Sequence, residues 1–271
     1  MRAALGFAIA CGFAGQALAE PPSTPVHVSY RTTLGGMAVA SSALAIEVIG
    51  DHYRLALDGL MIGGERTKTR ARVDVTGTIL RTVLIPERFS ATLEHGDGRK
   101  TRVALGFAGG TLAMVAVLPP PTGGSGRTRP PLSQSRGLLD PLTALVIPAA
   151  RANLAPLSVC GRTQRVFDGM RRYDIHMFPS RVEDIVVAGR SLPTLACGAE
   201  LRTAATASRR PERWPPLTPR GQRALVWLAP VAGGRLLAPV RIESGLRFGP
   251  LSVEAADANA FTTASRSASL R

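Results

Sequence analysis

The sequence predicts a mainly β-stranded domain in which a long antiparallel sheet curls into an incomplete barrel or a β-spiral. Apolar and polar residues alternate with a period of two along most of the chain, which is typical of strands that bury one face. Only one segment, beginning at Asp140-Pro141, has the pattern of a principal helix. A long antiparallel sheet must curl or close to protect its edges, so we expect a barrel-like form, with a β-sandwich as the alternative.

The first half of the chain reads as a meander of about eight strands joined by short connections. Gly50-Asp51 and the run from His95 to Gly98 each separate two alternating segments, which is a hairpin signal. The alternating segments are Val26–Tyr30, Leu44–Val48, Tyr53–Leu57, Val73–Val75, Ile79–Ile85, Phe89–Leu93, Val103–Phe107 and Thr111–Leu118.

Two polar stretches and one helix interrupt the second half. Residues 119–137 and 207–221 are rich in Pro, Gly, Ser and Arg, so we expect flexible surface loops there. Asp140 as N-cap and Pro141 in the first turn predict a helix that runs toward Ala152. The remaining strands are expected at Thr163–Phe167, Met170–Phe178, Arg181–Ala188, Leu192–Thr206, Arg223–Val231, Arg235–Glu243 and Leu246–Ala255. Residues 20–255 would then form a single domain, and residues 256–271 a disordered tail.

The N-terminus has the three parts of a secretory signal. Arg2 is followed by an apolar run from Ala3 to Gly15, and small residues occupy the −3 and −1 positions at Ala17 and Ala19. We therefore expect residues 1–19 to be a signal peptide, cleaved after Ala19, and the mature protein to be periplasmic. A lipid anchor on Cys11 is the alternative. No later stretch is apolar enough to span a bilayer, so at most peripheral membrane contact is expected.

Cleavage of the signal would leave two cysteines, Cys160 and Cys197. In an exported protein an even pair of cysteines predicts a disulfide bond. The four histidines are scattered without a short-spaced pair, so we expect neither a metal site nor another cofactor.

The formal net charge of +14 resembles that of a nucleic-acid-binding protein, but the composition argues against this partner. Nearly all the positive residues are Arg, and aromatic residues make up only 5%, too few for a base-stacking surface. Export would also remove most nucleic acid from reach. A solvated basic surface is the simpler interpretation, and attraction to anionic lipid head groups or other envelope polyanions is the functional one.

No pattern of catalytic residues stands out, so we do not expect an enzyme. Ser125 lies in a Gly-rich run that fails the nucleophile-elbow pattern, and Asp168-Gly169 is a preferred hairpin turn. Glu183 and Asp184 would point to opposite faces of a strand. Trp227 opens an apolar strand and is a candidate either for the core or for the lining of an apolar ligand pocket.

Several segments of the second half carry a family resemblance. They are Leu139–Leu145, Cys160 with Arg165–Asp174, Leu195–Cys197, and Val226–Ala229 with Pro239–Ile242. In order and spacing they resemble an exported family of Gram-negative bacteria catalogued as domain of unknown function 3108. The family has no assigned activity. Its signal peptide, curled antiparallel sheet and single bridge are similar to those of envelope proteins that carry lipids or lipoproteins in open barrels, which is an analogy of fold.

We therefore expect a non-catalytic, monomeric cell-envelope protein whose sheet holds a lipid or other apolar ligand, or docks an envelope partner. A hydrolase with a site assembled from distant residues and a structural scaffold without ligand are the alternatives. The expected ligand surface is the concave face of the sheet, formed by the aliphatic rows Leu44-Ile46-Val48, Leu55-Leu57, Val103-Leu105 and Val226-Leu228. If the sheet closes tightly, these rows would instead pack on one another.

Overall fold

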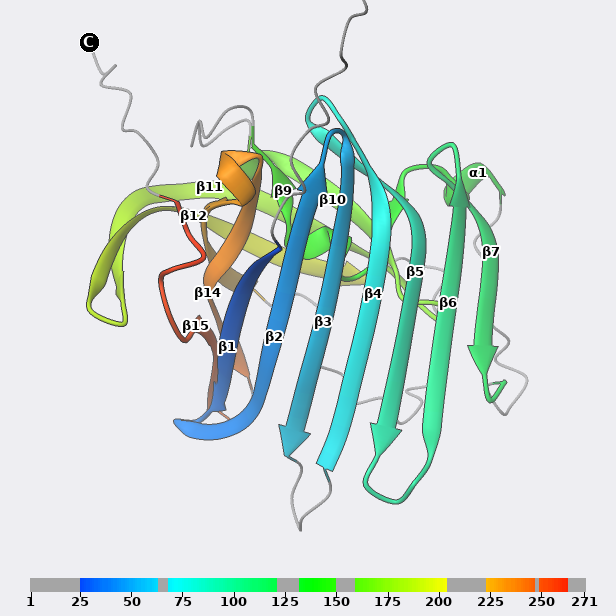
Figure 1. Ribbon diagram of the computed structural model, residues 1–271, viewed down its shortest axis with the longest axis horizontal. Helices are drawn as coiled ribbons and strands as arrows, with labels where there is room; N and C mark the ends of the chain where they lie inside the picture. The colour runs from blue at the N-terminus through cyan, green and yellow to red at the C-terminus, as the bar shows by residue number, and fades with distance from the viewer. Residues whose placement is uncertain are drawn as a thin grey trace, which may run out of the picture.

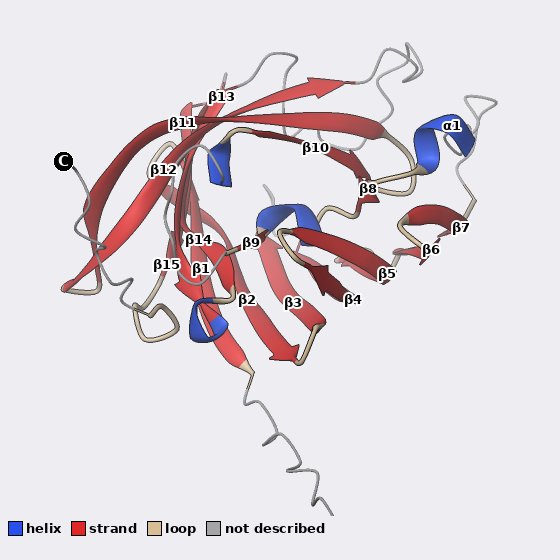
Figure 2. Ribbon diagram, turned by 90° about the horizontal axis from the view of Figure 1, so that it is seen from above, coloured by secondary structure: helices blue, strands red, loops and turns tan. Residues whose placement is uncertain are grey.

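The computed structural model describes residues 25–62, 68–120, 132–149, 159–203, 223–246 and 249–262. In these residues a 15-stranded sheet curls into a nearly closed barrel with one seam (Figures 1 and 2). The predicted curled antiparallel sheet is therefore confirmed, and the β-sandwich alternative is wrong.

The first half is an antiparallel meander of seven strands. These are β1 (Val26–Leu34), β2 (Met37–Ile49), β3 (His52–Ile62), β4 (Lys68–Leu80), β5 (Val83–His95), β6 (Lys100–Ala108) and β7 (Thr111–Leu118). The sequence suggested about eight because Gly77 was taken as a break. In the structure β4 runs through Gly77, which lies directly beneath the ring of Tyr53 on β3. A side chain at that position would leave no room for the ring.

The second half contains short elements and then long strands. In chain order they are α1 (Leu132–Ser135), β8 (Leu138–Leu139), η2 (Thr143–Leu145), β9 (Ile147–Pro148), β10 (Arg162–Phe167), β11 (Arg172–Val187), β12 (Arg190–Thr203), β13 (Arg223–Val231), η3 (Ala232–Gly234), β14 (Leu236–Leu246) and β15 (Gly249–Ala255). Across the sheet the order runs from β7 back to β1, then from β15 back to β10, and ends at β8. The first strand is therefore hydrogen-bonded to the last, with Tyr30 opposite Ala255.

The seam lies between β7 and β8, the two ends of the sheet. A single antiparallel bridge joins Thr111 to Arg136, and the Gly137 amide donates to the Gly110 carbonyl over 2.7 Å. The turn between β10 and β11 also covers this region, because a Cβ on Gly169 would lie 2.5 Å from a methyl group of Val103 on β6. Side-chain packing thus continues where the ladder of hydrogen bonds stops.

The predicted helix from Asp140 toward Ala152 is wrong. The chain makes one 3-10 turn at η2 and then extends, with Val146 at φ −112° and ψ 147°. Ile147 precedes Pro148, and a residue before proline is disfavoured in helical conformation. Extended Ile147 and Pro148 pair with β14 as strand β9. Residues 150–152 lie outside the described residues.

The predicted loops and tail are shorter than expected where the structure describes them. The end of the loop expected over 119–137 is ordered, because 132–135 form α1 and Ser135 is fully buried. The expected disordered tail begins with a packed segment, since Phe261 is buried and the Thr262 amide donates to the Pro230 carbonyl. The signal peptide at 1–19, the loop at 207–221 and residues 263–271 lie outside the described residues.

Two clusters of buried apolar side chains form the core. The larger contains the inward residues of β1–β7 and continues to Trp227 and Ala229 on β13. The smaller surrounds Cys160 and Cys197 and includes Leu228. Trp227 and Leu228 are neighbours and point to opposite faces, so the two clusters bury β13 on both sides. In the described part of the chain, no helix combines the length and the apolar character needed to cross a membrane.

Candidate functional site

The predicted disulfide bond is present and joins Cys160 to Cys197, whose Cα atoms lie 5.5 Å apart. Both cysteines are fully buried, in the smaller core cluster. The bond ties the chain just before β10 to the middle of β12. Elsewhere, the described residues contain no group of three or more His, Cys, Asp or Glu side chains that could hold a metal ion.

Asp140 is a fully buried carboxylate that caps a turn rather than a helix. Its Oδ1 accepts hydrogen bonds from the amides of Leu142 and Thr143 at 3.0 and 2.9 Å, and its Oδ2 accepts from the Thr143 hydroxyl at 2.6 Å. The same hydroxyl contacts Tyr53 Oη at 3.1 Å. Burial raises the pKa of Asp140 to about 6, against the lowering effect of these hydrogen bonds. The network anchors the 138–149 segment to β3, and its polar atoms face one another rather than a cleft.

Asp168 has the predicted role in a hairpin turn. Its carboxylate accepts from the amides of Met170 and Arg171 at 2.8 and 2.6 Å, and burial raises its pKa. Arg172 donates to Gln134 of α1 at 2.8 Å and lies 3.6 Å from the Asp174 carboxylate. These charged residues hold the turn and the seam together.

Trp227 is 4% exposed and lies in a cluster of charged side chains. Its indole N–H donates to Glu183 over 2.5 Å, and the guanidinium carbons of Arg181 and Arg241 lie 5.9 and 5.7 Å from the ring centroid. Such distances allow cation–π attraction. Hydrogen bonds from Arg181 and then Trp227 lower the pKa of Glu183.

The strand register shows which face Trp227 occupies. Trp227 lies opposite Arg241, which lies opposite Glu254, which lies opposite Arg31. Residues directly opposite in a ladder share a face, and Arg31 points away from the face of its neighbour Tyr30. Trp227 and Leu228 lie on opposite faces of β13, and Trp227 packs in the larger core cluster whereas Leu228 packs in the smaller one.

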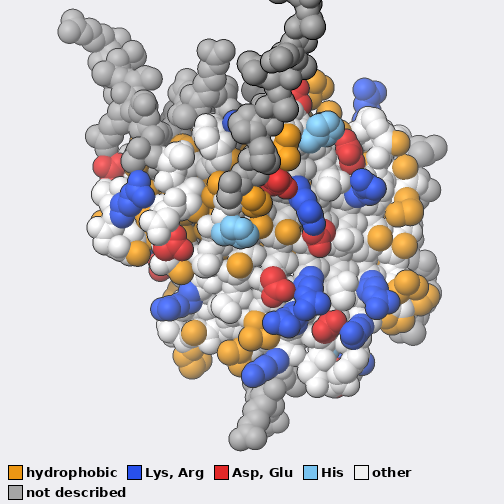
Figure 3. All heavy atoms as spheres, in the orientation of Figure 1, with side chains coloured by type: hydrophobic (Ala, Val, Ile, Leu, Met, Phe, Trp, Pro, Cys, Tyr) orange, Lys and Arg blue, Asp and Glu red, His pale blue; other side chains and the backbone are white. Residues whose placement is uncertain are grey.

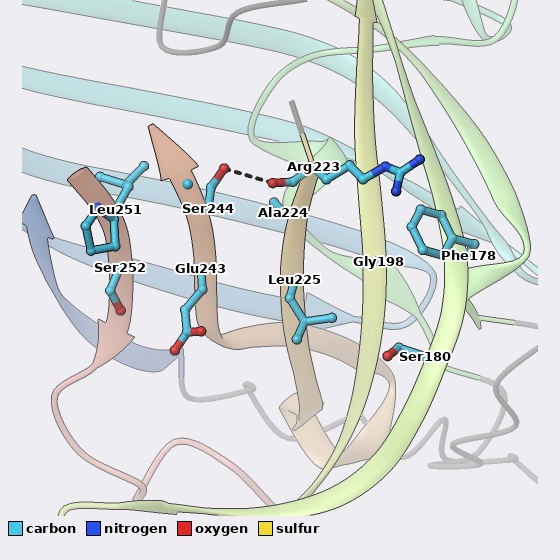
Figure 4. A pocket seen from close by; sticks show the side chains of 12 residues that line it. Phe178, Ser180, Gly198, Arg223, Ala224, Leu225, Glu243, Ser244, Leu251 and Ser252 are labelled. Carbon is cyan, nitrogen blue, oxygen red and sulfur yellow. Dashed lines mark hydrogen bonds between the residues drawn. The ribbon is translucent and has the colours of Figure 1, made fainter. Parts of the chain in front are cut away.

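Beside this row, an open groove of about 670 Å³ crosses β11 to β15 (Figure 4). The row of residues at its centre is continuous across five strands: Phe178, Gly198, Leu225, Glu243 and Ser252 lie opposite one another in turn. Pro250 and Leu251 add apolar surface, and Arg223, Ser180 and Ser244 add polar groups. The groove thus combines apolar surface with polar groups, including the Glu243 carboxylate in its central row.

Two glycines shape the groove. A Cβ on Gly198 would lie 2.1 Å from the ring of Phe178, so the ring covers this glycine closely. A Cβ on Gly245 would meet nothing within 4 Å, so the groove is open there. The Ser244 hydroxyl is bonded to the Arg223 carbonyl at 3.0 Å, whereas the buried Ser252 hydroxyl has no hydrogen-bond partner among the described residues.

Sequence reasoning identified Trp227 but missed the groove beside it. Of the groove residues, none belongs to a motif, because they come from five strands that are adjacent only through their register. The small residues Gly198 and Gly245 inside alternating strands were the available signal, since glycine in a strand often marks a close approach or an open site.

The fold and the groove define a barrel-like β protein, and the comparisons agree with that class. No protein-family model and no curated protein matches the chain. The chain is similar to the crystal structure of a beta-barrel-like protein of domain of unknown function DUF1849 from Brucella abortus, with a TM-score of 0.50 and 10% sequence identity. The match covers 86% of this chain and 96% of that one, and at this identity it shows the fold alone. The resemblance to domain of unknown function 3108 stays a prediction.

Proposed function

We propose that this protein is a non-catalytic binding protein of the periplasm whose groove across β11–β15 holds an amphipathic, lipid-like ligand. The groove itself carries the proposal, because it places apolar surface beside a cation. Leu225 and Phe178 supply apolar surface, and Arg223 lies opposite Glu200, whose ion pair at 3.0 Å is with Arg202. The volume of the groove, about 670 Å³, is within the range of about 300–1,000 Å³ that is usual for small-molecule sites.

The chemistry of the groove favours an acyl chain with an anionic head group. An acyl chain fits against Leu225, Pro250 and Leu251, while the guanidinium of Arg223 suits a carboxylate or phosphate. The concave face is less suitable, because Leu44, Ile46 and Leu55 are at most 1% exposed. The interior also contains the 138–149 segment, whose residues Leu138 and Ile147 are equally buried. The ligand surface is therefore proposed on the opposite face from the one that the sequence suggested.

The carboxylates that could serve catalysis are engaged in structural contacts, which favours a binding role. Asp140 and Asp168 are engaged in turns, and Glu183 is bonded to Trp227 and Arg181. The buried disulfide suits an oxidising compartment, as the periplasm is. N-terminal sequencing of the exported protein should find Glu20 as the first residue. A lipid-modified terminus at Cys11 would contradict cleavage after Ala19.

Native mass spectrometry of exported protein incubated with palmitate, a fatty acid with one carboxylate, tests the groove. The unmodified protein should retain the fatty acid. Gly245→Phe should abolish retention, because the new ring enters open space in the groove without displacing an atom near its Cβ. Arg223→Glu should weaken retention at least tenfold by placing two negative charges together.

Ser90→Phe is the matched control, since Ser90 is exposed on β5 far along the sheet from the groove. It should retain palmitate as the unmodified protein does. Equal retention by Gly245→Phe would place the ligand elsewhere, and no retention by the unmodified protein would favour a scaffold.

A further inference from the structure

The outward face of β3 to β6, here called the basic face, carries more positive than negative side chains. Its basic residues are Arg54, Lys68, Arg70, Arg72, Arg88, Lys100 and Arg102, and its acidic residues are Asp58, Asp74 and Glu94. The register places them on one side, because each lies opposite another outward residue of the next strand. Figure 3 shows these charged side chains gathered over the strands.

Ion pairs account for only part of this charge. Arg54 is 3.2 Å from Asp74, Arg72 is 3.3 Å from Asp58, and Lys100 is 2.9 Å from Glu94. Exposed pairs of this kind are common on the solvated face of a sheet and add little to stability. Arg88 and Arg102 are also exposed, yet neither forms an ion pair with a described residue.

An apolar stripe on the edge strand β7 lies next to these two unpaired cations. Met114, Ala116 and Leu118 point outward, and Met114 and Leu118 are 51% and 54% exposed. Leu118 lies directly opposite Arg102, and Met114 lies opposite Gly106, which lies opposite Arg88. Edge strands of soluble proteins usually carry charges that protect them, but β7 has none from Thr111 to Leu118.

We propose that the basic face and the β7 stripe together dock the protein on an anionic phospholipid surface. A phospholipid surface offers both negative head groups for Arg88 and Arg102 and a hydrocarbon boundary for Met114 and Leu118. Charge complementarity alone would suit any polyanion, and the exposed aliphatic side chains beside the cations distinguish the lipid. The outward rows of β3 to β7 contain no Phe, Tyr or Trp on which nucleic-acid bases could stack.

The surface is separate from the proposed ligand groove, so the two can be tested independently. The groove lies across β11 to β15, whereas the basic face lies on β3 to β6, on the other side of β1 and β2 in the order of the sheet. A protein that takes up a lipid-like ligand would gain from contact with the surface that supplies it.

Cosedimentation of the exported protein with lipid vesicles tests this docking. The protein should pellet with phosphatidylcholine vesicles that contain about a third phosphatidylglycerol, and not with pure phosphatidylcholine. Arg102→Glu should reduce the partition coefficient roughly tenfold, because losing one basic residue near an anionic membrane costs about fivefold and the new carboxylate is repelled by the head groups. Met114→Ser with Leu118→Ser should reduce it about fivefold without changing the charge.

Arg190→Glu is the matched control, since Arg190 is exposed at the turn between β11 and β12 and its replacement changes the net charge equally. It should alter the partition less than twofold. An equal loss in Arg190→Glu and Arg102→Glu would overturn the proposal in favour of nonspecific charge. Full binding by the Met114→Ser, Leu118→Ser variant would show that the surface recognises polyanions in general, and an unmodified protein that stays in solution would refute docking outright.

Discussion

Replacing Asp140 by Asn isolates the free energy of burying one carboxylate inside the barrel. Asn retains an oxygen that can accept from the amides of Leu142 and Thr143. Its amide group can donate to the Thr143 hydroxyl, which can in turn donate to Tyr53 Oη. The substitution therefore preserves the hydrogen bonds while removing the charge.

The magnitude follows from the pKa of Asp140, which burial raises from 3.8 to about 6. A raised carboxyl pKa means that the folded state holds its proton more tightly than the unfolded state. The unfolding free energy therefore falls as the pH rises from below 3.8 to above 6, and a shift of this size corresponds to about 3 kcal/mol. The Asn variant has no such titration. We expect the two proteins to be similar near pH 4 and the variant to be more stable by about 3 kcal/mol near pH 7.

Urea unfolding at several pH values between 4 and 7 measures this difference. Asp140→Ala is the control that removes the acceptors, and it should be less stable than Asp140→Asn at every pH, because two buried amides lose their partner at about 1–3 kcal/mol each. The reasoning is refuted if the stabilities of the Asn variant and the unmodified protein differ by a constant amount across the range. Such a result would mean that the three hydrogen bonds offset burial and that Asp140 titrates normally.

Two further experiments test the packing and the covalent link. Gly77→Ala would place a Cβ 2.5 Å from Tyr53 Oη and 2.4 Å from the Ile85 carbonyl oxygen, so thermal unfolding should show a loss of about 1–3 kcal/mol, whereas Gly245→Ala, which has open space, should be nearly neutral. Equal effects of the two substitutions would contradict the close contact. Replacing Cys160 and Cys197 together by Ser should cost about 2–5 kcal/mol in guanidinium unfolding, because the bond closes a 37-residue loop and both residues are buried. Free thiols at these positions in the denatured, unreduced protein would show instead that the bond does not form.

Most strands could be predicted because each strand has one buried face and therefore alternates. The Gly50-Asp51 hairpin shows this well, since Ile46 pairs with Leu55 as the two alternating segments indicate. The β13 strand has the predicted bounds, Arg223–Val231. Local sequence was sufficient in these places because turn chemistry and hydrophobic pattern agree.

The 138–149 segment and the groove could not be predicted, because both depend on contacts between distant parts of the chain. Asp140 and Pro141 carry the local signals of a helix start, yet burial inside the barrel and pairing with β14 determine the conformation of Ile147 and Pro148. The pairing of β13 with β14 contains a register shift between Trp227 and Leu228 that no local pattern marks. The groove depends on five strands being aligned residue by residue.

The pairing of β1 with β15 makes the first and last strands of the sheet depend on each other. During synthesis or export, β1 presents an unpaired edge until nearly the whole chain has emerged, because Tyr30 must wait for Ala255. Contacts of such large sequence separation slow folding and leave strand edges open to other chains. A chain truncated before Gly249 would keep that edge permanently, so it should depend on chaperones or aggregate.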